Sequence, residues 1–272
     1  EGDRFVVERN GDFYVRKDDS FLFRDGDVVV DYEQLPRGLV REVVTRPNGV
    51  QIITVRDAGG YVLRRVRQSP NGDRVVLFDI RDGDRVEFID YDRQLPPLRV
   101  RRPLDDYIVS ARRADRRLFY NTFASEPVEQ VQTGYSLQSI RDNERLRSTV
   151  SRIDLDTVEF ASGSSFVTSS QVRLLGDIAG AMLDVIEQNP AAVFLIEGHT
   201  DAVGSELSNL TLSDRRAESV AQILVEYYRV PPENLVTQGY GEQFLKVNTQ
   251  TASQANRRVT VRNISPILYS GN

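Results

Sequence analysis

The chain has 272 residues and carries 35 Lys and Arg against 40 Asp and Glu, which gives a net charge of -5. This near balance argues against a dedicated nucleic-acid binder, because such proteins usually carry a strong basic excess. With no cysteine and a single histidine, the chain offers no disulfide, thiolate metal site, cysteine nucleophile or multi-histidine metal site.

The first hundred residues are punctuated by five Asn-Gly or Asp-Gly pairs. These pairs favour the positive φ angles of type I′ turns and are the strongest short-range hairpin signal. Short runs of β-branched and aromatic residues between them are typical of strands. We therefore predict an antiparallel β-meander, folded as a curled sheet or a small barrel. The pairs begin at Asn10, Asp25, Asn48, Asn71 and Asp82, and the runs are 4–9, 13–16, 21–24, 28–32, 50–55, 61–66, 74–80 and 85–92.

Three prolines, Pro96, Pro97 and Pro103, break strand pairing and mark the end of a β-rich domain over residues 1–103. Residues 104–151 are interpreted as a linker that contains a connecting helix over 135–150. The helix has Ser136 as a plausible N-cap. Its apolar residues Leu137, Ile140 and Leu146 fall roughly in phase.

The remainder of the chain alternates between strand and helix patterns. The predicted order is β-α-β-α-β-β, which indicates a sandwich with helices on one side of a mixed sheet. The whole chain is thus of the α+β class, with this unit over 152–265 and a tail over 266–272. The strands are predicted at 156–160, 192–198, 234–241 and 257–264. One helix is predicted at 168–190, and a second follows the strand 192–198 and extends to Tyr228.

The second of these helices carries an arginine on its apolar face. Leu212, Val220 and Leu224 are four or eight residues apart and share one face, and Arg216 lies midway between the first two. A buried and unpaired guanidinium costs several kcal/mol, so Arg216 requires a partner in the fold or in a ligand.

The residues around Arg216 form a longer pattern, N-x2-L-S-x2-R-A-x2-V-x3-L. The segments GHTD at 198–201, GYGE at 239–242 and NRRV at 256–259 stand before and after it. Together they resemble the OmpA-like peptidoglycan-binding domain family over about residues 152–264. The pattern positions are Asn209, Leu212, Ser213, Arg216, Ala217, Val220 and Leu224.

This resemblance implies non-covalent binding of peptidoglycan through the meso-diaminopimelate of its stem peptide. It places Asp201 on the ammonium of the ligand's free stereocentre and Arg216 on its carboxylate. Thr200 and Asn209 match positions that supply further hydrogen bonds, and Arg258 lies near the site. The resemblance implies no catalytic residue, no metal ligand and no cofactor, so we expect a binding protein and not an enzyme.

The chemistry agrees with that implication. A carboxylate at a strand end that faces an arginine on the next helix complements an ammonium and a carboxylate on one carbon, and guanidinium grips carboxylate bidentately. Two such contacts suggest an affinity of about micromolar to millimolar. Arg216→Ala should then abolish binding with little effect on the fold. One departure is Ala161, where many members have Asp or Asn, and Ser162 or backbone groups could replace that contact.

Structural alternatives stay open for each of these residues. Asp201 and Arg216 could form an ion pair with each other. Asn209 and Ser213 could be residues of the helix start, since both types cap well. His199 beside Asp201 is interpreted as a packing residue at a strand end, because no nucleophile elbow accompanies it.

We therefore expect a protein that anchors to the cell wall, in the periplasm and associated with the outer membrane and the wall. The alternative is an envelope scaffold whose N-terminal β domain recruits a protein partner, with wall binding secondary. No run approaches the 18 apolar residues of a transmembrane helix, and we expect no nucleic-acid partner. A start at Glu1 without methionine is compatible with the removal of a targeting segment.

Overall fold

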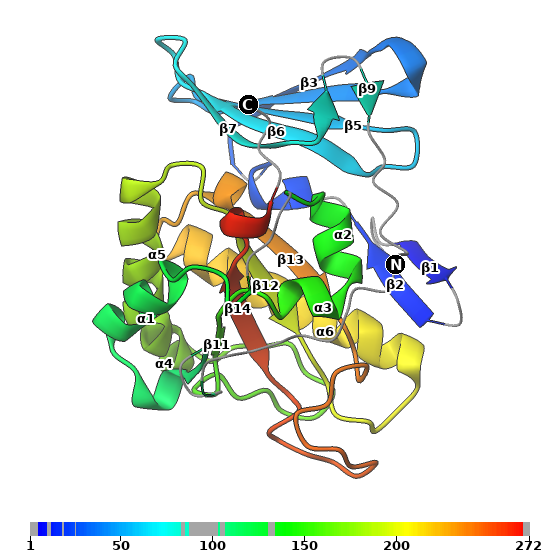
Figure 1. The fold of residues 1–272 in the computed structure, drawn as a ribbon, viewed down its shortest axis with the longest axis vertical. Helices are drawn as coiled ribbons and strands as arrows, with labels where there is room; N and C mark the ends of the chain where they lie inside the picture. Colours follow the sequence, from blue (N-terminus) through cyan, green and yellow to red (C-terminus); the bar gives the residue numbers. More distant parts are fainter. Residues whose placement is uncertain are drawn as a thin grey trace.

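The computed structural model describes residues 5–9, 12–17, 19–24, 26–82, 85–86, 103, 107–129 and 134–268. A five-stranded sheet lies at one end of the molecule, and a larger unit of helices around a second sheet lies below it (Figure 1). The first of these comes from the N-terminal half of the sequence, and the second comes mainly from the C-terminal half.

The N-terminal sheet is an open antiparallel meander, which selects the curled sheet over the small barrel. Its strands pair in the order of the sequence, with the first and the last at the edges. Two of the predicted turns lie between neighbouring strands, where Gly49 and Gly72 have φ of 79° and 93°. The strands are β3 (Val29–Gln34), β4 (Val40–Thr45), β5 (Gln51–Arg56), β6 (Val62–Gln68) and β7 (Arg74–Asp79).

Other expectations for this half need correction. Residues 21–24 do not form a strand, because the amides of Phe23 and Arg24 both donate to the Ser20 carbonyl and close the 3-10 turn η1 (Asp19–Leu22). Strand β4 was not predicted. The pair beginning at Asn10 and most of the run 85–92 lie outside the described residues. Short hairpins are formed by β1 (Phe5–Arg9) with β2 (Asp12–Arg16), and by β8 (Arg81–Asp82) with β9 (Arg85–Val86).

The second sheet is mixed, as predicted, with the strand order β10-β11-β14-β12-β13. The pairs β10–β11 and β12–β13 are parallel, and β14 is antiparallel to both of its neighbours. The strand predicted at 156–160 is found earlier, at β11, and β10 lies inside the predicted linker. The strands are β10 (Ile108–Ser110), β11 (Arg152–Asp154), β12 (Phe194–Gly198), β13 (Leu235–Gly239) and β14 (Val259–Asn263).

The two long helices α5 (Gly176–Gln188) and α6 (Glu206–Glu226) cover one face of this sheet, in the predicted chain order. Phe194 and Ile196 of β12 point into the core that these helices share. Other short helices and 3-10 turns lie in the segments that flank the strands and the long helices. They are α1 (Arg116–Phe123), α4 (Ser169–Val172), η2 (Pro36–Gly38), η4 (Ala111–Arg113), η5 (Arg173–Leu175), η6 (Pro232–Asn234) and η7 (Ser265–Ile267).

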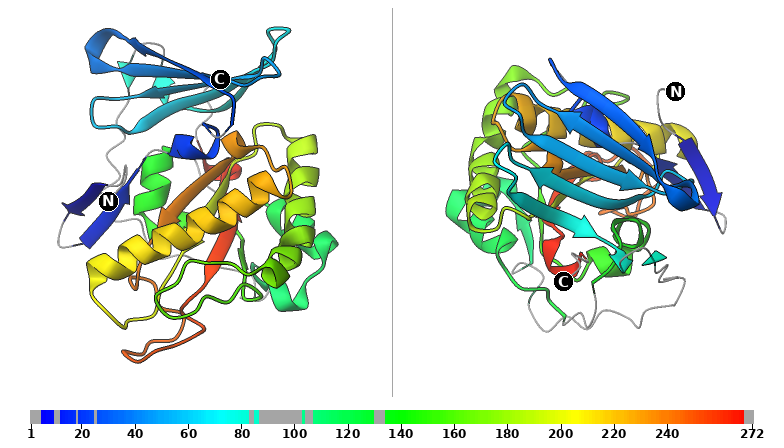
Figure 2. Two further views of the ribbon diagram at one scale, coloured as in Figure 1. Left: turned by 180° about the vertical axis from the view of Figure 1, so that it is seen from behind. Right: turned by 90° about the horizontal axis from the view of Figure 1, so that it is seen from above.

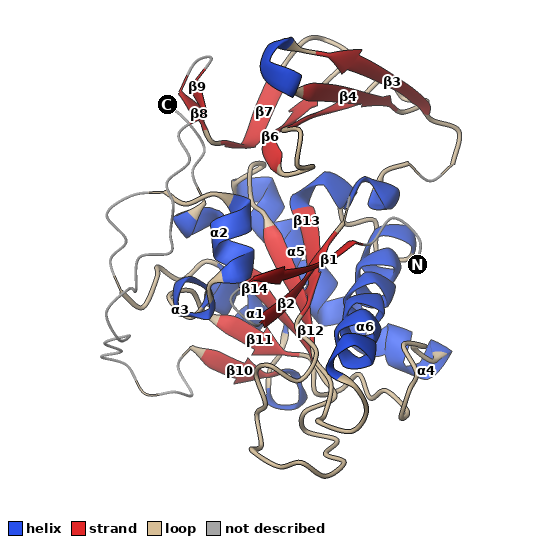
Figure 3. Ribbon diagram, turned by 90° about the vertical axis from the view of Figure 1, so that its right-hand side faces the viewer, coloured by secondary structure: helices blue, strands red, loops and turns tan. Residues whose placement is uncertain are grey.

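The opposite face of the sheet is covered by the connecting segment. The predicted helix is broken into α2 (Leu137–Asp142) and α3 (Glu144–Arg147) at Asn143, whose backbone is extended and whose side chain caps α3. Ser136 is the N-cap of α2, and its hydroxyl accepts from the Ser139 amide at 3.0 Å. Figure 3 shows α2 and α3 on one side of the sheet and α6 on the other.

The N-terminal sheet is fixed to the lower unit by a buried carboxylate. Glu233, 1% exposed, lies 2.7 Å from Arg46 of the β4–β5 turn and 3.5 Å from Arg67 of β6. Views from behind and above place this sheet across the ends of β13 and α2 (Figure 2). Over the described ranges, no helix combines the length and the hydrophobicity of a membrane span.

Candidate functional site

The candidate site lies where β12 ends and α6 begins. Strand β12 ends at Gly198, and α6 begins at Glu206 with Ser205 as its N-cap, which accepts from the Ser208 amide at 3.3 Å. Helix α6 packs against the strand so closely that a Cβ on Gly198 would stand 1.8 Å from the Ser213 carbonyl oxygen. This contact brings Arg216, one turn further along the helix, over the end of β12.

Arg216 has partners within the fold. Its side chain is fully buried, and it donates from Nε to the Ser164 carbonyl at 3.0 Å and from Nη1 to the His199 carbonyl at 3.1 Å. Nη2 donates to the Ala161 carbonyl at 3.3 Å. The guanidinium also lies 4.9 Å from the ring centre of Phe160. Burial lowers the pKa of Arg216 to about 10, so the group stays charged at neutral pH.

Asp201 is paired with Arg257, 2.7 Å away, and not with Arg216. Its carboxylate also accepts from the amides of Ser253 at 3.2 Å and Val203 at 3.4 Å. Burial would raise the pKa of Asp201, but the hydrogen bonds and the charge of Arg257 outweigh it and lower that pKa. Asp201 is therefore an anion whose ion-pair partner is 18% exposed.

Arg257 was missed from the sequence, where its neighbour Arg258 was selected instead. Strand β14 begins only at Val259, so both arginines lie in the segment before it, and the structure places Arg257 with Asp201. Arg258 instead donates to the Phe244 carbonyl at 3.0 Å. Because neither arginine is part of the strand, the alternation of side chains expected for a strand over 257–264 could not separate the two.

The two remaining predicted residues surround Asp201. Asn209 lies in the first turn of α6 but is not its N-cap, which is Ser205. Its amide donates to the carbonyls of Asp201 and Val203, both at 3.2 Å, and to the Glu242 carboxylate at 2.5 Å. It thereby fixes the loop before α6. The Thr200 amide donates to the Gly241 carbonyl at 2.9 Å, while its buried hydroxyl has no hydrogen-bond partner among the described residues.

These contacts change the expectation for Arg216→Ala. Removal of the guanidinium leaves three carbonyl acceptors without their donor, and that of His199 is buried. We therefore expect a loss of about 2 kcal/mol in the free energy of unfolding. Urea unfolding of the variant measures this loss. Arg215→Ala removes an exposed guanidinium from the same helix and should change stability by less than about 0.5 kcal/mol. Equal stability of the two variants would contradict a structural role for Arg216.

His199 lies on the opposite side of the same strand end. Its ring is 3% exposed and stacks on Tyr240 with 5.8 Å between ring centres. Nε2 is 3.8 Å from the Glu197 carboxylate, too far for a hydrogen bond. Burial and the positive charge of Arg258 lower the pKa of His199 to about 3. The ring is thus neutral at physiological pH and packs in the interior.

This burial predicts acid sensitivity. In the unfolded chain His199 binds a proton below about pH 6.5, whereas in the fold it remains neutral down to about pH 3. The stability that the neutral His199 allows is therefore fully present above about pH 6.5, the pKa of the unfolded chain. As the pH drops from there toward about 3, the folding equilibrium constant falls by roughly tenfold per pH unit. Urea unfolding at pH 7 and pH 5 measures the fall. His199→Phe keeps a ring on Tyr240 and should reduce it; an identical fall would exclude His199 as the source.

In the described part of the chain, no group of three or more His, Asp or Glu side chains is placed to hold a metal ion. A cavity of about 430 Å³ lies at the far end of α6, where it is lined by Phe21, Leu22, Arg24, Gln222, Val225 and Glu226. Asp201, at the other end of the helix, is not part of it.

Comparisons with known proteins concern the same part of the chain. Residues 159–258 match the OmpA family. Outer membrane porin F of Pseudomonas aeruginosa is 36% identical over 112 residues, which are 40% of this chain and 31% of that protein. The putative lipoprotein YfiB of Escherichia coli is 38% identical over 68 residues, 24% of this chain and 42% of that one. The chain spans about a third of the length of the porin F relatives that it matches.

Among solved structures, the peptidoglycan-associated lipoprotein from Burkholderia pseudomallei is 27% identical. The matched part covers 38% of this chain and 84% of that chain, with a TM-score of 0.33.

Proposed function

We propose that residues 159–258, which form an OmpA family domain, bind peptidoglycan non-covalently and anchor an envelope protein to the cell wall. The observation that carries the proposal is that the Arg216 guanidinium, from the middle of α6, donates to the carbonyl of His199, two residues before Asp201. Both charged groups that the family resemblance selects therefore lie beside the end of β12. Both groups are charged at neutral pH, and the negative charge of Asp201 acts to raise the pKa of Arg216, against the larger effect of burial. A binding role agrees with the family match, whose members are anchoring or structural proteins and not enzymes.

The ligand we propose is the meso-diaminopimelate of the stem peptide. Its free stereocentre carries one ammonium and one carboxylate. The ammonium would take the place of the Arg257 guanidinium at Asp201, since the two cations compete for the same carboxylate. Arg257 is partly exposed and can move aside without leaving a buried charge unpaired.

Access to Arg216 requires a further step. The guanidinium is covered by the loop 161–164, whose carbonyls at Ala161 and Ser164 accept from Nη2 and Nε. A ligand carboxylate reaches the guanidinium only if it replaces one of these carbonyls, so binding is coupled to an opening of this loop. The exchange of a neutral acceptor for a charged one favours the bound state. Many family members have Asp or Asn at the position of Ala161. In this chain the loop contacts Arg216 through the backbone carbonyls of Ala161 and Ser164.

Co-sedimentation with insoluble peptidoglycan tests the proposed function. The full chain should pellet with purified peptidoglycan that contains diaminopimelate and stay in the supernatant without it. The amount bound should fall with increasing concentration of free meso-diaminopimelate, because the free amino acid carries the same charged groups. A folded chain that remains in the supernatant at every peptidoglycan concentration would overturn the proposal.

The place of action follows from the proposed ligand. A chain that binds peptidoglycan works in the periplasm, in association with the wall and the outer membrane. The alternative function, recruitment of a protein partner by the N-terminal β domain, stays a prediction. It concerns the edge strand β3, where Val29 and Tyr32 are each 61% exposed.

A further inference from the structure

Residues 13–17 together with Asp19, called the strap below, run along the free edge of the second sheet. Strand β13 is the last strand of that sheet, so its outer edge has no neighbouring strand. The side chains of Gln238 and Gln243 hold the strap backbone: their amides donate to the carbonyls of Val15 at 3.1 Å and Phe13 at 2.9 Å. A segment from the start of the chain thus covers an edge near its end.

The outward backbone groups of Thr237 are satisfied by an ion pair. The Thr237 amide donates to the Asp19 carboxylate at 3.3 Å, and the Thr237 carbonyl accepts from the Arg141 guanidinium at 3.2 Å. Asp19 and Arg141 are hydrogen-bonded to each other, and Asp19 is fully buried. The pair therefore replaces the donor and the acceptor that a neighbouring strand would offer to an edge residue.

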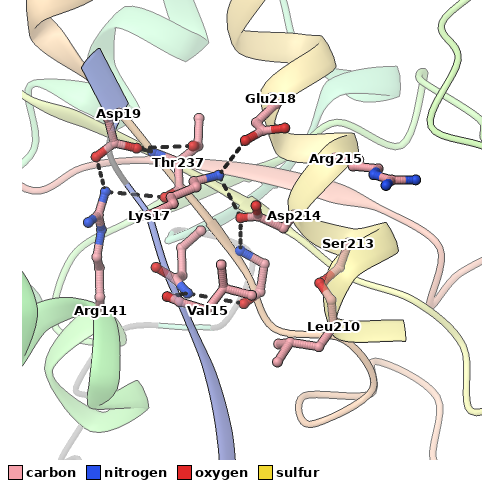
Figure 4. Close-up of polar contacts among 12 residues, drawn as sticks. Val15, Lys17, Asp19, Arg141, Leu210, Ser213, Asp214, Arg215, Glu218 and Thr237 are labelled. Carbon is pink, nitrogen blue, oxygen red and sulfur yellow. Dashed lines mark hydrogen bonds and ion pairs between the residues drawn. The ribbon is translucent and has the colours of Figure 1, made fainter. Parts of the chain in front are cut away.

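A second ion pair joins the strap to α6. Lys17, whose side chain is 3% exposed, lies 2.6 Å from Asp214 and 3.1 Å from Glu218. Asp214 also accepts from the amide of Gly239 at 3.1 Å and so covers the next outward donor of β13. Figure 4 shows Lys17 between the two carboxylates, with Arg215 pointing away from it.

We propose that the edge of β13, with Asp214, Glu218 and Arg141 beside it, is an interaction surface for an extended peptide segment. The segment it recognises carries a lysine and an aspartate two residues apart, and this chain occupies the surface with its own strap. Lys17 contacts Asp214 and Glu218 of α6, and Asp19 contacts Thr237 and Arg141, so both side chains are directed at this surface. The inference rests on these contacts and does not depend on peptidoglycan binding.

One consequence concerns the N-terminal sheet. The strap precedes β3, and β10, which pairs with β11, follows the sheet in the chain. Both sequence ends of the N-terminal sheet are therefore attached to the lower unit. The strap makes that unit discontinuous in sequence, because residues 13–17 and 19–24 belong with it and not with the β3–β7 sheet.

A cut in the folded chain tests the surface. A specific protease site is inserted between Gly26 and Asp27, both exposed, and the full chain is cleaved after folding. We expect the fragment 1–26 to co-elute with the remainder in size-exclusion chromatography. Lys17→Ala and Asp19→Ala should each weaken the association of the fragment with the remainder about tenfold or more, because each removes a charged hydrogen-bond partner. Glu8→Ala, which removes an exposed side chain of β1, should leave this association unchanged.

Hydrogen exchange supplies a second test on the uncut chain, in case the insertion prevents folding. The Thr237 amide should exchange slowly in the natural sequence and at least about tenfold faster in Asp19→Ala. Release of the fragment from a remainder that keeps its circular dichroism spectrum would overturn the proposal. An unchanged exchange rate of Thr237 in Asp19→Ala would overturn it as well.

Discussion

Replacement of Gly198 by alanine is expected to lower the free energy of unfolding by about 3 kcal/mol or more. The added Cβ would meet the Ser213 carbonyl oxygen at 1.8 Å and its carbon at 2.7 Å, and both are backbone atoms of α6. The helix must shift away from β12, since no side-chain rotation relieves the clash. This shift also separates Arg216 from the His199 carbonyl, so binding should fall with stability.

Urea unfolding of Gly198→Ala measures the effect, and Gly180→Ala is the matched control. In α5, a Cβ on Gly180 would meet the guanidinium of Arg116 at 2.9 Å, which is the end of a flexible and half-exposed side chain. Alanine in a helix interior is also favoured over glycine by about 1 kcal/mol. The control should therefore be neutral or stabilising. Equal stability of Gly198→Ala and the natural sequence would contradict the close packing of α6 on β12.

Asp201→Asn is expected to weaken binding of a diaminopimelate stem peptide by about 100-fold. The amide has the size of the carboxylate but cannot balance an ammonium, and hydrogen bonds to charged groups contribute about 1.5–3 kcal/mol each. The fold should persist, because Arg257 is partly exposed and can turn to solvent. Isothermal titration calorimetry of the two proteins measures the change in affinity.

Glu206→Gln is the control for this change, since it removes an exposed carboxylate from the first turn of α6, the helix that follows Asp201 in the chain. Its affinity should equal that of the natural sequence. If both variants lose affinity to the same degree, net charge near the end of α6 is responsible, and the specific role of Asp201 is excluded.

Local patterns predicted much of the C-terminal half. The order of strands and helices follows from alternation and from the 3.6-residue period, and Ser136 was recognised as a cap from its place before an apolar stripe. The strand predicted at 156–160 was wrong because burial does not require a strand: Val158 and Phe160 are buried in a loop. Phe160 packs under the guanidinium of Arg216 there.

The site was only partly predictable for a related reason. The pattern around Arg216 selected the residue, and its stripe position correctly indicated a buried guanidinium that needs partners. Those partners are carbonyls of residues 161, 164 and 199, and backbone acceptors leave no trace in the sequence. Arg257 was missed because the choice between adjacent arginines depends on the fold of the segment before β14, which meets the site.

The strap could not be predicted from local sequence. Asp19 and Thr237 are 218 positions apart, and their contact exists only when β13 is the edge of its sheet. A short apolar run such as 21–24 gives the same signal for a strand as for the turn that forms. The partners that decide the outcome are contributed by distant parts of the chain.

The most direct test of the proposed clamp is a calorimetric titration of the full chain with two stem peptides, one containing meso-diaminopimelate and one containing lysine at that position. Both offer an ammonium to Asp201, but only the first offers a carboxylate to Arg216. Binding of the diaminopimelate peptide at least about tenfold tighter than the lysine peptide is the predicted result. Equal affinities, or no binding of either peptide by the folded chain, would contradict the clamp.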